Sequence, residues 1–174
     1  MKNTLLILFL GFFTSTQAQN KETGWTSLKD KNYSIRYPNN WEPDQSKQGG
    51  TTFILLSVLE DAYDNFRENV NLIIQDLSGK NIDLAKFTEI STEQVKTYIP
   101  NAKIISSDVV KAKSGDYHKI IYTGDQGKFH LEFEQRYWVV NNKAYVLTFT
   151  SEETKFASFK ETAEKVLESF VIKK

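Results

Sequence analysis

Residues 33–41 read Tyr33-Ser34-Ile35-Arg36-Tyr37-Pro38-Asn39-Asn40-Trp41 and combine a strand pattern, a stop and an aromatic residue. Tyr33, Ile35 and Tyr37 alternate with polar residues, which is typical of a β-strand with one buried face. Pro38 lacks an N–H donor and ends the strand, and the asparagines favour a turn. We therefore expect Trp41 to fold back over the tyrosines and close a corner of the core, with a binding role as the alternative.

Strand patterns continue on both sides of this segment. A turn at residues 30–32 would pair residues 25–28 with residues 33–37 in a hairpin. Residues 52–59 form a nearly continuous apolar run, which is typical of a strand covered on both faces. A further strand is predicted at 69–77, and its apolar face carries Val70, Leu72 and Ile74.

The period of the pattern then changes to that of a helix. Residues of one helical face recur at spacings of three and four: Leu84, Phe87, Ser91, Val95 and Tyr98. Asp83 is a candidate N-cap, and Ile82 could form a hydrophobic staple with Phe87. Pro100 would stop the helix.

Strands return after Pro100 and lead to the clearest strand of the chain. We expect strands over 103–110 and 117–122 and a turn at 124–127. In the next strand, 129–139, one face is apolar and the other carries His130, Glu132, Glu134 and Arg136. For Tyr145, Leu147 and Phe149 of the following strand to share a face with Tyr137 and Val139, the connecting loop must be residues 141–143.

A second helical stripe follows these strands. Its members are Phe156, Phe159, Ala163, Val166, Leu167 and Phe170, and Glu152 and Glu153 suit the start of a helix. The order is therefore strands, a helix, strands and a helix. This order predicts an α+β domain with an antiparallel sheet rather than a series of βαβ units.

The first 18 residues have the features of a cleaved secretory signal. Lys2 precedes an apolar run from Leu5 to Phe13, and small residues occupy the usual cleavage positions at Thr16 and Ala18. The run is shorter than the ~20 residues that cross hydrocarbon, which argues against a membrane anchor. We expect cleavage after Ala18, a short polar lead at 19–24, and a single domain over 25–174 in the periplasm or outside the cell.

Composition excludes several classes of protein. The chain has no cysteine, so a lipid-modified cysteine at the cleavage site, a disulfide framework and thiolate chemistry are all impossible. Basic and acidic residues number 22 each, a balance that provides no footprint for nucleic acid or an anionic membrane. We therefore expect no nucleic-acid partner and no membrane insertion of the mature chain, and we expect a monomer.

Four segments, in this order, resemble the PsbP-like superfamily of PsbP, DcrB-type and Mog-like proteins. They are Tyr37–Trp41, Asp64–Asn71, Lys143–Thr150 and Leu167–Phe170. The resemblance is to a bacterial, secreted member, and it implies a central antiparallel sheet flanked by helices on both sides, an α/β/α sandwich. It also implies a non-enzymatic binding or assembly role, in which an envelope protein or a small ligand is the partner.

Histidine chemistry would have to use His118 or His130, because the chain has no other histidine. If Ile120 lies opposite Leu131 in the hairpin, His118 falls opposite Phe133 and His130 falls on the other face. The two rings could not then share a metal ion. Each histidine is expected to pack at the surface or rim.

Glu132 and Glu134 form the alternative catalytic candidate. Residues two apart on a strand are separated by about 6.5 to 7 Å, so these carboxylates could bracket a glycosidic bond. In the expected register Lys119 lies opposite Glu132, and cross-strand charge pairing is the simpler interpretation. A hydrolase using Glu132 and Glu134 remains the second functional hypothesis.

The acidic segment 60–68 is the candidate cation site. Asp61, Asp64 and Glu68 supply the oxygen ligands that calcium prefers, but the spacing and the central glycine of an EF-hand loop are missing. Asp64 could equally cap a turn. We expect a structural loop, with weak cation binding as the alternative.

The favoured function is a non-enzymatic binding or assembly module. Without a catalytic constellation in the sequence, no catalytic residue, metal ligand or cofactor is assigned. The candidate partner-binding residues are Tyr63, Phe66 and Trp41, because exposed aromatic residues often anchor protein interfaces.

Overall fold

The computed structural model describes residues 24–112 and 115–173, so the expected signal sequence lies outside the described residues. The helices are α1 (Leu84–Tyr98) and α2 (Glu153–Glu168), with a short 3₁₀ turn η1 (Gln48–Gly50). The strands are β1 (Trp25–Lys29), β2 (Tyr33–Pro38), β3 (Glu42–Asp44), β4 (Phe53–Leu56), β5 (Asn69–Asp76), β6 (Lys103–Val110), β7 (Tyr117–Gln126), β8 (Phe129–Val140), β9 (Lys143–Glu152) and β10 (Val171–Ile172). The predicted order of strands, helix, strands and helix is confirmed, and the fold is α+β.

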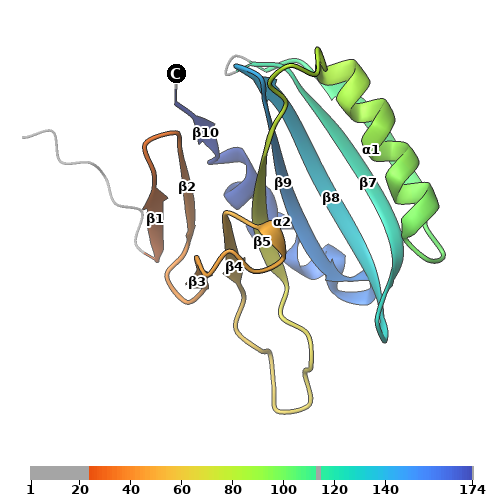
Figure 1. Cartoon of the computed structure of the whole chain (residues 1–174). Coiled ribbons are helices and arrows are strands. Elements are labelled where there is room, and N and C mark those ends of the chain that lie inside the picture. The colour runs from red at the N-terminus through yellow and green to blue at the C-terminus, as the bar shows by residue number, and fades with distance from the viewer. Residues whose placement is uncertain (1–23, 113–114, 174) are drawn as a thin grey trace, which may run out of the picture.

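Seven strands form one antiparallel sheet in the order β3-β4-β5-β9-β8-β7-β6. Helix α1 lies across one face of this sheet, and α2 lies behind the other face (Figure 1). The predicted hairpin β1-β2 is confirmed, but it joins β10 in a separate sheet of three strands. Within the described residues, no helix is both long enough and apolar enough to cross a membrane.

The core behind the sheet is shared by α2 and the small sheet. Rings from four segments meet there: Tyr33 lies 5.6 Å from Phe53, and Trp138 lies 5.4 Å from Phe170, measured between ring centroids. Trp41 is 6% exposed and belongs to this core. Its burial agrees with the corner role and leaves little of its surface for a partner.

The core under α1 lies against β7 and β8. Phe87 and Val95 of α1 are buried against Ile120 and Tyr137 of the sheet. The predicted N-cap is confirmed, because Asp83 Oδ1 accepts the Lys86 N–H at 2.8 Å. Tyr98 was expected on the apolar face but is 73% exposed, so this face ends before the last turn of the helix.

The predicted three-residue loop between β8 and β9 is wrong. Val140 pairs with Lys143, so the loop is Asn141-Asn142, and both residues have positive φ, as a two-residue hairpin of type I′ requires. Tyr145 therefore lies opposite Trp138, and its side chain is on the other face from Tyr137. The prediction failed because it assumed one buried face, whereas α1 and α2 bury both faces of these strands.

The predicted β7–β8 register is also wrong, by four residues. Ile120 pairs with Gln135, because β7 continues through Gly124 to Gln126 and the turn is Gly127-Lys128. A Cβ atom on Gly124 would come within 2.3 Å of Ile99 Cγ2. Glycine is needed here because the segment after α1 approaches the strand closely, and not because the chain turns.

Strand β4 is covered on one face only, contrary to the prediction for residues 52–59. Phe53 and Leu55 are fully buried, whereas Ile54 and Leu56 are half-buried on the α1 side of the sheet. Because α1 contacts β7 and β8, the same face of β4, of β5 at Asn69 and Asn71, and of the end of β9 at Thr150 has no helix of the described residues over it. This uncovered half-face holds the candidate site.

Candidate binding groove

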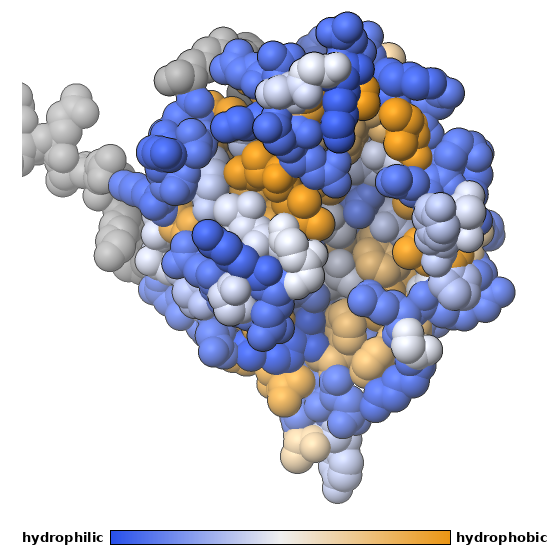
Figure 2. Space-filling view, in the orientation of Figure 1, coloured by the Kyte–Doolittle hydropathy of each residue, from blue (hydrophilic) through white to orange (hydrophobic). Residues whose placement is uncertain are grey.

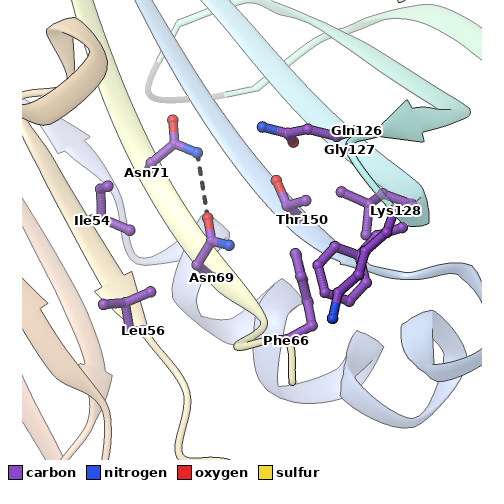
Figure 3. A pocket seen from close by; sticks show the side chains of 11 residues that line it. Ile54, Leu56, Phe66, Asn69, Asn71, Gln126, Gly127, Lys128 and Thr150 are labelled. Atoms are coloured by element: carbon purple, nitrogen blue, oxygen red, sulfur yellow. Dashed lines mark hydrogen bonds between the residues drawn. The ribbon is translucent and has the colours of Figure 1, made fainter. Parts of the chain in front are cut away.

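A groove of about 640 Å³ lies on the uncovered half-face (Figure 3). In the orientation of Figure 1, apolar side chains are visible both above and below the middle of the view, with hydrophilic ones around them (Figure 2). The lining residues come from five strands, one turn and one loop: Ile54, Leu56, Phe66, Asn69, Asn71, Gln126, Gly127, Lys128, Phe129, Leu131 and Thr150.

One wall of the groove is aromatic. Phe66, from the β4–β5 loop, packs against Phe129 with 5.1 Å between the ring centroids. The Lys128 ammonium lies 5.0 Å from the centroid of the Phe129 ring, within reach of a cation–π interaction. Among the candidate partner-binding residues, Phe66 lies in the groove, while Tyr63 is 88% exposed on the loop outside it.

The floor of the groove carries neutral polar groups. Asn71 Nδ2 donates to Asn69 Oδ1 at 3.5 Å, and Asn69 Nδ2 donates to the Arg67 carbonyl at 3.1 Å. The Thr150 hydroxyl and the Gln126 amide also line the groove (Figure 3). Lys128 is the only charged side chain among the described lining residues, so the groove offers amides, a hydroxyl, apolar walls and a single cation.

The acidic loop beside the groove is folded around a lysine. Lys155 Nζ, from α2, lies 2.8 Å from Glu60 Oε2 and 3.1 Å from Asp64 Oδ1. Asp61 Oδ1 accepts the N–H groups of Tyr63 and Asp64. The pKa of Lys155 is raised, chiefly by its hydrogen bond to Glu60, so the ammonium is the cation that these carboxylates surround.

The residues proposed for a weak cation site do not converge on one point. Asp61 and Asp64 accept backbone N–H groups within the loop, while Glu68 is fully buried. The Glu68 carboxyl accepts long hydrogen bonds of 3.4 Å from the hydroxyls of Ser57 and Ser151, and burial raises its pKa. Across residues 24–112 and 115–173, no group of three or more histidine or acidic residues is arranged to hold a metal ion.

The Glu132 and Glu134 carboxylates do not share an open pocket. Glu134 is 2% exposed, and its oxygens lie 2.8 Å from Arg136 Nη2 and 3.2 Å from Lys119 Nζ. Lys119 pairs with Arg136 rather than with Glu132, so that part of the prediction is wrong, although cross-strand charge pairing does occur. Arg136 also binds Glu164 of α2 at 2.7 Å, which makes this cluster part of the helix–sheet contact.

The histidines lie on opposite faces of the sheet. His118 stacks on Tyr137 under α1, its Nε2 lies 2.8 Å from Ser107 Oγ, and burial lowers its pKa. His130 contacts Asp125 and lies 3.7 Å from Glu153 of α2, and the hydrogen bond to Asp125 raises its pKa. Because the register error is an even number of residues, each histidine lies on the expected face of the sheet. The residues opposite it on the paired strand differ from those expected.

Sequence reasoning missed most of the groove residues. Asn69, Asn71 and Thr150 follow no motif, Gln126 ends β7, and Lys128 belongs to an ordinary hairpin turn. The one available signal was the apolar run at 52–59, because the second face of its strand is covered by no helix of the described residues. An apolar strand face beside polar residues on the next strand is compatible with a binding surface.

The fold and groove define a class of protein, an α+β domain whose antiparallel sheet keeps half of one face uncovered. The PsbP family profile matches residues 23–172, and the chain belongs to the PsbP family. This family is generally non-enzymatic. No curated protein sequence matches this chain as a relative.

Solved structures share the fold at low sequence identity. CyanoP, the cyanobacterial PsbP of Synechocystis sp. PCC 6803, is 16% identical with a TM-score of 0.62, over 86% of this chain and 93% of that one. LpqN, involved in cell envelope biogenesis of Mycobacterium tuberculosis, is 13% identical with a TM-score of 0.67, over 86% and 91% of the two chains. PA94 of Pseudomonas aeruginosa, of unknown function, is 13% identical with a TM-score of 0.61, over 86% and 98%.

Proposed function

We propose that this protein is a non-enzymatic, extracytoplasmic binding or assembly module that holds its ligand or partner in the groove. The observation that carries the proposal is the groove itself, whose volume of about 640 Å³ falls within the range of small-ligand sites. Convergent amides and a hydroxyl between apolar walls are the usual composition of such sites.

The extracytoplasmic location rests on two observations. The first 18 residues have the charge, apolar run and small residues of a secretory signal, and the chain lacks the cysteine that a lipoprotein would need. LpqN, which has a similar fold, is involved in cell envelope biogenesis. We therefore favour a protein of the periplasm or the cell exterior.

A hydrolase using Glu132 and Glu134 receives no support from the geometry. A general acid must reach the leaving group of its substrate, but the Glu134 carboxylate lies beneath α2 and is paired with two cations. The buried cluster is better explained as a helix–sheet contact.

A matched pair of variants tests the proposed function. Asn71→Trp would fill the groove, whereas Gln75→Trp adds the same ring to an exposed site on the same strand and face, outside the lining. Each variant and the wild-type protein are immobilised and exposed to envelope extract of the source organism. We expect ligand or partner captured by the wild type and Gln75→Trp to be lost with Asn71→Trp, and equal capture by all three would refute the groove as the site.

A further inference from the structure

The two ends of the groove differ in charge, because one end is aliphatic and uncharged whereas the other combines the Lys128 ammonium with the rings of Phe66 and Phe129. Ile54 and Leu56 of β4 make one end aliphatic, and the Lys128 ammonium belongs to the other end, beyond Thr150 (Figure 3). Between these ends lie the neutral side chains of Asn69 and Asn71. A matching ligand is apolar at one end, hydrogen-bonding in the middle and anionic at the other end.

The arrangement of the strands gives the length of such a ligand. From Ile54 and Leu56 to Lys128, which directly precedes β8, the groove crosses the neighbouring strands β4, β5, β9 and β8, and β7 contributes only its last residue, Gln126. Neighbouring strands lie about 4.8 Å apart, so three steps amount to about 14 Å. An extended peptide advances about 3.4 Å per residue, so about four residues would fill this length.

The charge of the lining favours a carboxylate at the Lys128 end. Within the described part of the chain, the Lys128 ammonium contacts an aromatic ring and makes no ion pair. None of the described residues that line the groove is acidic. An anion placed there would meet a cation and no repelling carboxylate, which is the complementarity that fixes the direction of a bound ligand.

The middle of the groove favours a peptide over a fatty acid. An acyl chain would lie on the amides of Asn69 and Asn71 and on the Thr150 hydroxyl without offering them a hydrogen bond. Burying polar groups without partners costs about 1 to 3 kcal/mol each. Peptide groups supply both donors and acceptors, and so they satisfy these side chains.

We propose that the groove binds the last four residues of a peptide with a free C-terminal carboxylate, an inference that rests on the proposed function. The carboxylate lies at Lys128, the peptide groups meet Asn69, Asn71 and Thr150, and an apolar residue three positions before the C-terminus lies on Ile54 and Leu56. The partner is thus recognised by an exposed C-terminal tail.

Two synthetic pools test this proposal. Both contain acetylated tetrapeptides that begin with leucine and carry mixed Ala, Ser, Asn and Val at the other positions; one pool ends in a free carboxylate and the other in an amide. Binding is followed by chemical-shift changes of the ¹⁵N-labelled protein. We expect the free-acid pool to shift the signals of Asn69, Asn71 and Lys128, and the amidated pool to bind at least tenfold more weakly.

Variants separate the role of the charge from that of the groove. Lys128→Gln should reduce binding of the free-acid pool to that of the amidated pool. Lys103→Gln, which removes an exposed lysine of β6 outside the lining, should change the binding of neither pool. Asn71→Trp should abolish the binding of both pools. Equal binding of the acid and amide pools to the wild type, or no shift at the groove, would overturn the proposal.

A third probe distinguishes this proposal from the proposed function. If decanoate shifts the groove signals and neither peptide pool does, the groove is a ligand site but not a peptide site. If Asn71→Trp also captures the same material from envelope extract as the wild type, the groove is not the binding site and both proposals fail.

Discussion

Among single residues, Trp41 belongs to the core that α2 and the small sheet share, and it is 6% exposed. Replacing a buried tryptophan with alanine removes its apolar contacts and leaves a cavity. We expect Trp41→Ala to lower the free energy of unfolding by about 3 to 5 kcal/mol, measured by urea titration. Tyr63→Ala, at an exposed aromatic residue, should change it by less than about 0.5 kcal/mol. Similar values for both variants would exclude the corner role.

The buried Glu68 carboxyl makes the free energy of unfolding depend on pH in a predictable direction. Burial raises the pKa of Glu68 above its ordinary value of 4.5, so the folded state favours the protonated carboxyl. Its stabilising contribution is complete below about pH 4.5 and is lost as the pH rises through the raised pKa. The free energy of unfolding of the wild type, minus that of Glu68→Gln, should therefore fall as the pH increases from 4 to 7.

The Asp44 carboxyl provides a control, because its effect on the free energy of unfolding should change with pH in the opposite direction. Hydrogen bonds from Ser46, the backbone N–H first, lower the pKa of Asp44, so its contribution is present at neutral pH and lost on acidification. The difference between the wild type and Asp44→Asn should change in the opposite direction and at lower pH. A difference for Glu68→Gln that is constant with pH would show that this carboxyl has the same pKa in both states.

At the scale of contacts between elements, Lys155 of α2 forms ion pairs with Glu60 and Asp64 of the acidic β4–β5 loop. Lys155→Met keeps the aliphatic stem but removes the ammonium, so we expect amide hydrogen exchange in residues 57–68 to accelerate about tenfold. Lys160→Met, on the exposed part of the same helix, should leave this exchange unchanged. Unchanged exchange in both variants would mean that the turns of the loop suffice without α2.

The contact of α2 with the sheet includes the buried Glu134–Arg136 pair. Arg136→Leu leaves the buried Glu134 carboxylate with Lys119 alone, and we expect a loss of about 3 to 5 kcal/mol in the free energy of unfolding. The double variant Glu134→Leu/Arg136→Leu removes both charges and should recover most of this loss. A double variant as unstable as Arg136→Leu would indicate that packing of the arginine, rather than its charge, dominates.

For the whole molecule, the seven-stranded sheet joins the two cores, because β8 and β9 carry buried residues on both faces. All three tryptophans pack in the core under α2 and report on that side only. Phe133→Ala, under α1, should nevertheless lower the midpoint measured by tryptophan fluorescence as much as that measured by far-UV circular dichroism. A shift in circular dichroism alone would show that the two cores unfold separately.

Local features of the fold were predictable because they depend on residues within a few positions of one another. The Asp83 cap, the stripe of α2 and the facing of Val70 and Leu72 follow from hydrogen bonds and periods within one element. Register was less predictable, because β7 and β8 could pair in more than one way without exposing their apolar residues. In the β7–β8 pairing that the fold adopts, Gly124 lies within the strand and Ile99 approaches it closely.

The sequence by itself determined the α+β class, the order of the elements and the residues available for the core. Tertiary structure alone decided that Tyr137 and Tyr145 face opposite helices, and that Ile54 and Leu56 face a groove rather than a second helix. The reason is that alternation tells which residues share a face, whereas the docking of α1 and α2 decides which face is covered. Asn69, Asn71 and Lys128 meet in one site because α1 packs over β7, β8 and the first part of β9 and leaves β4, the first part of β5 and the end of β9 open.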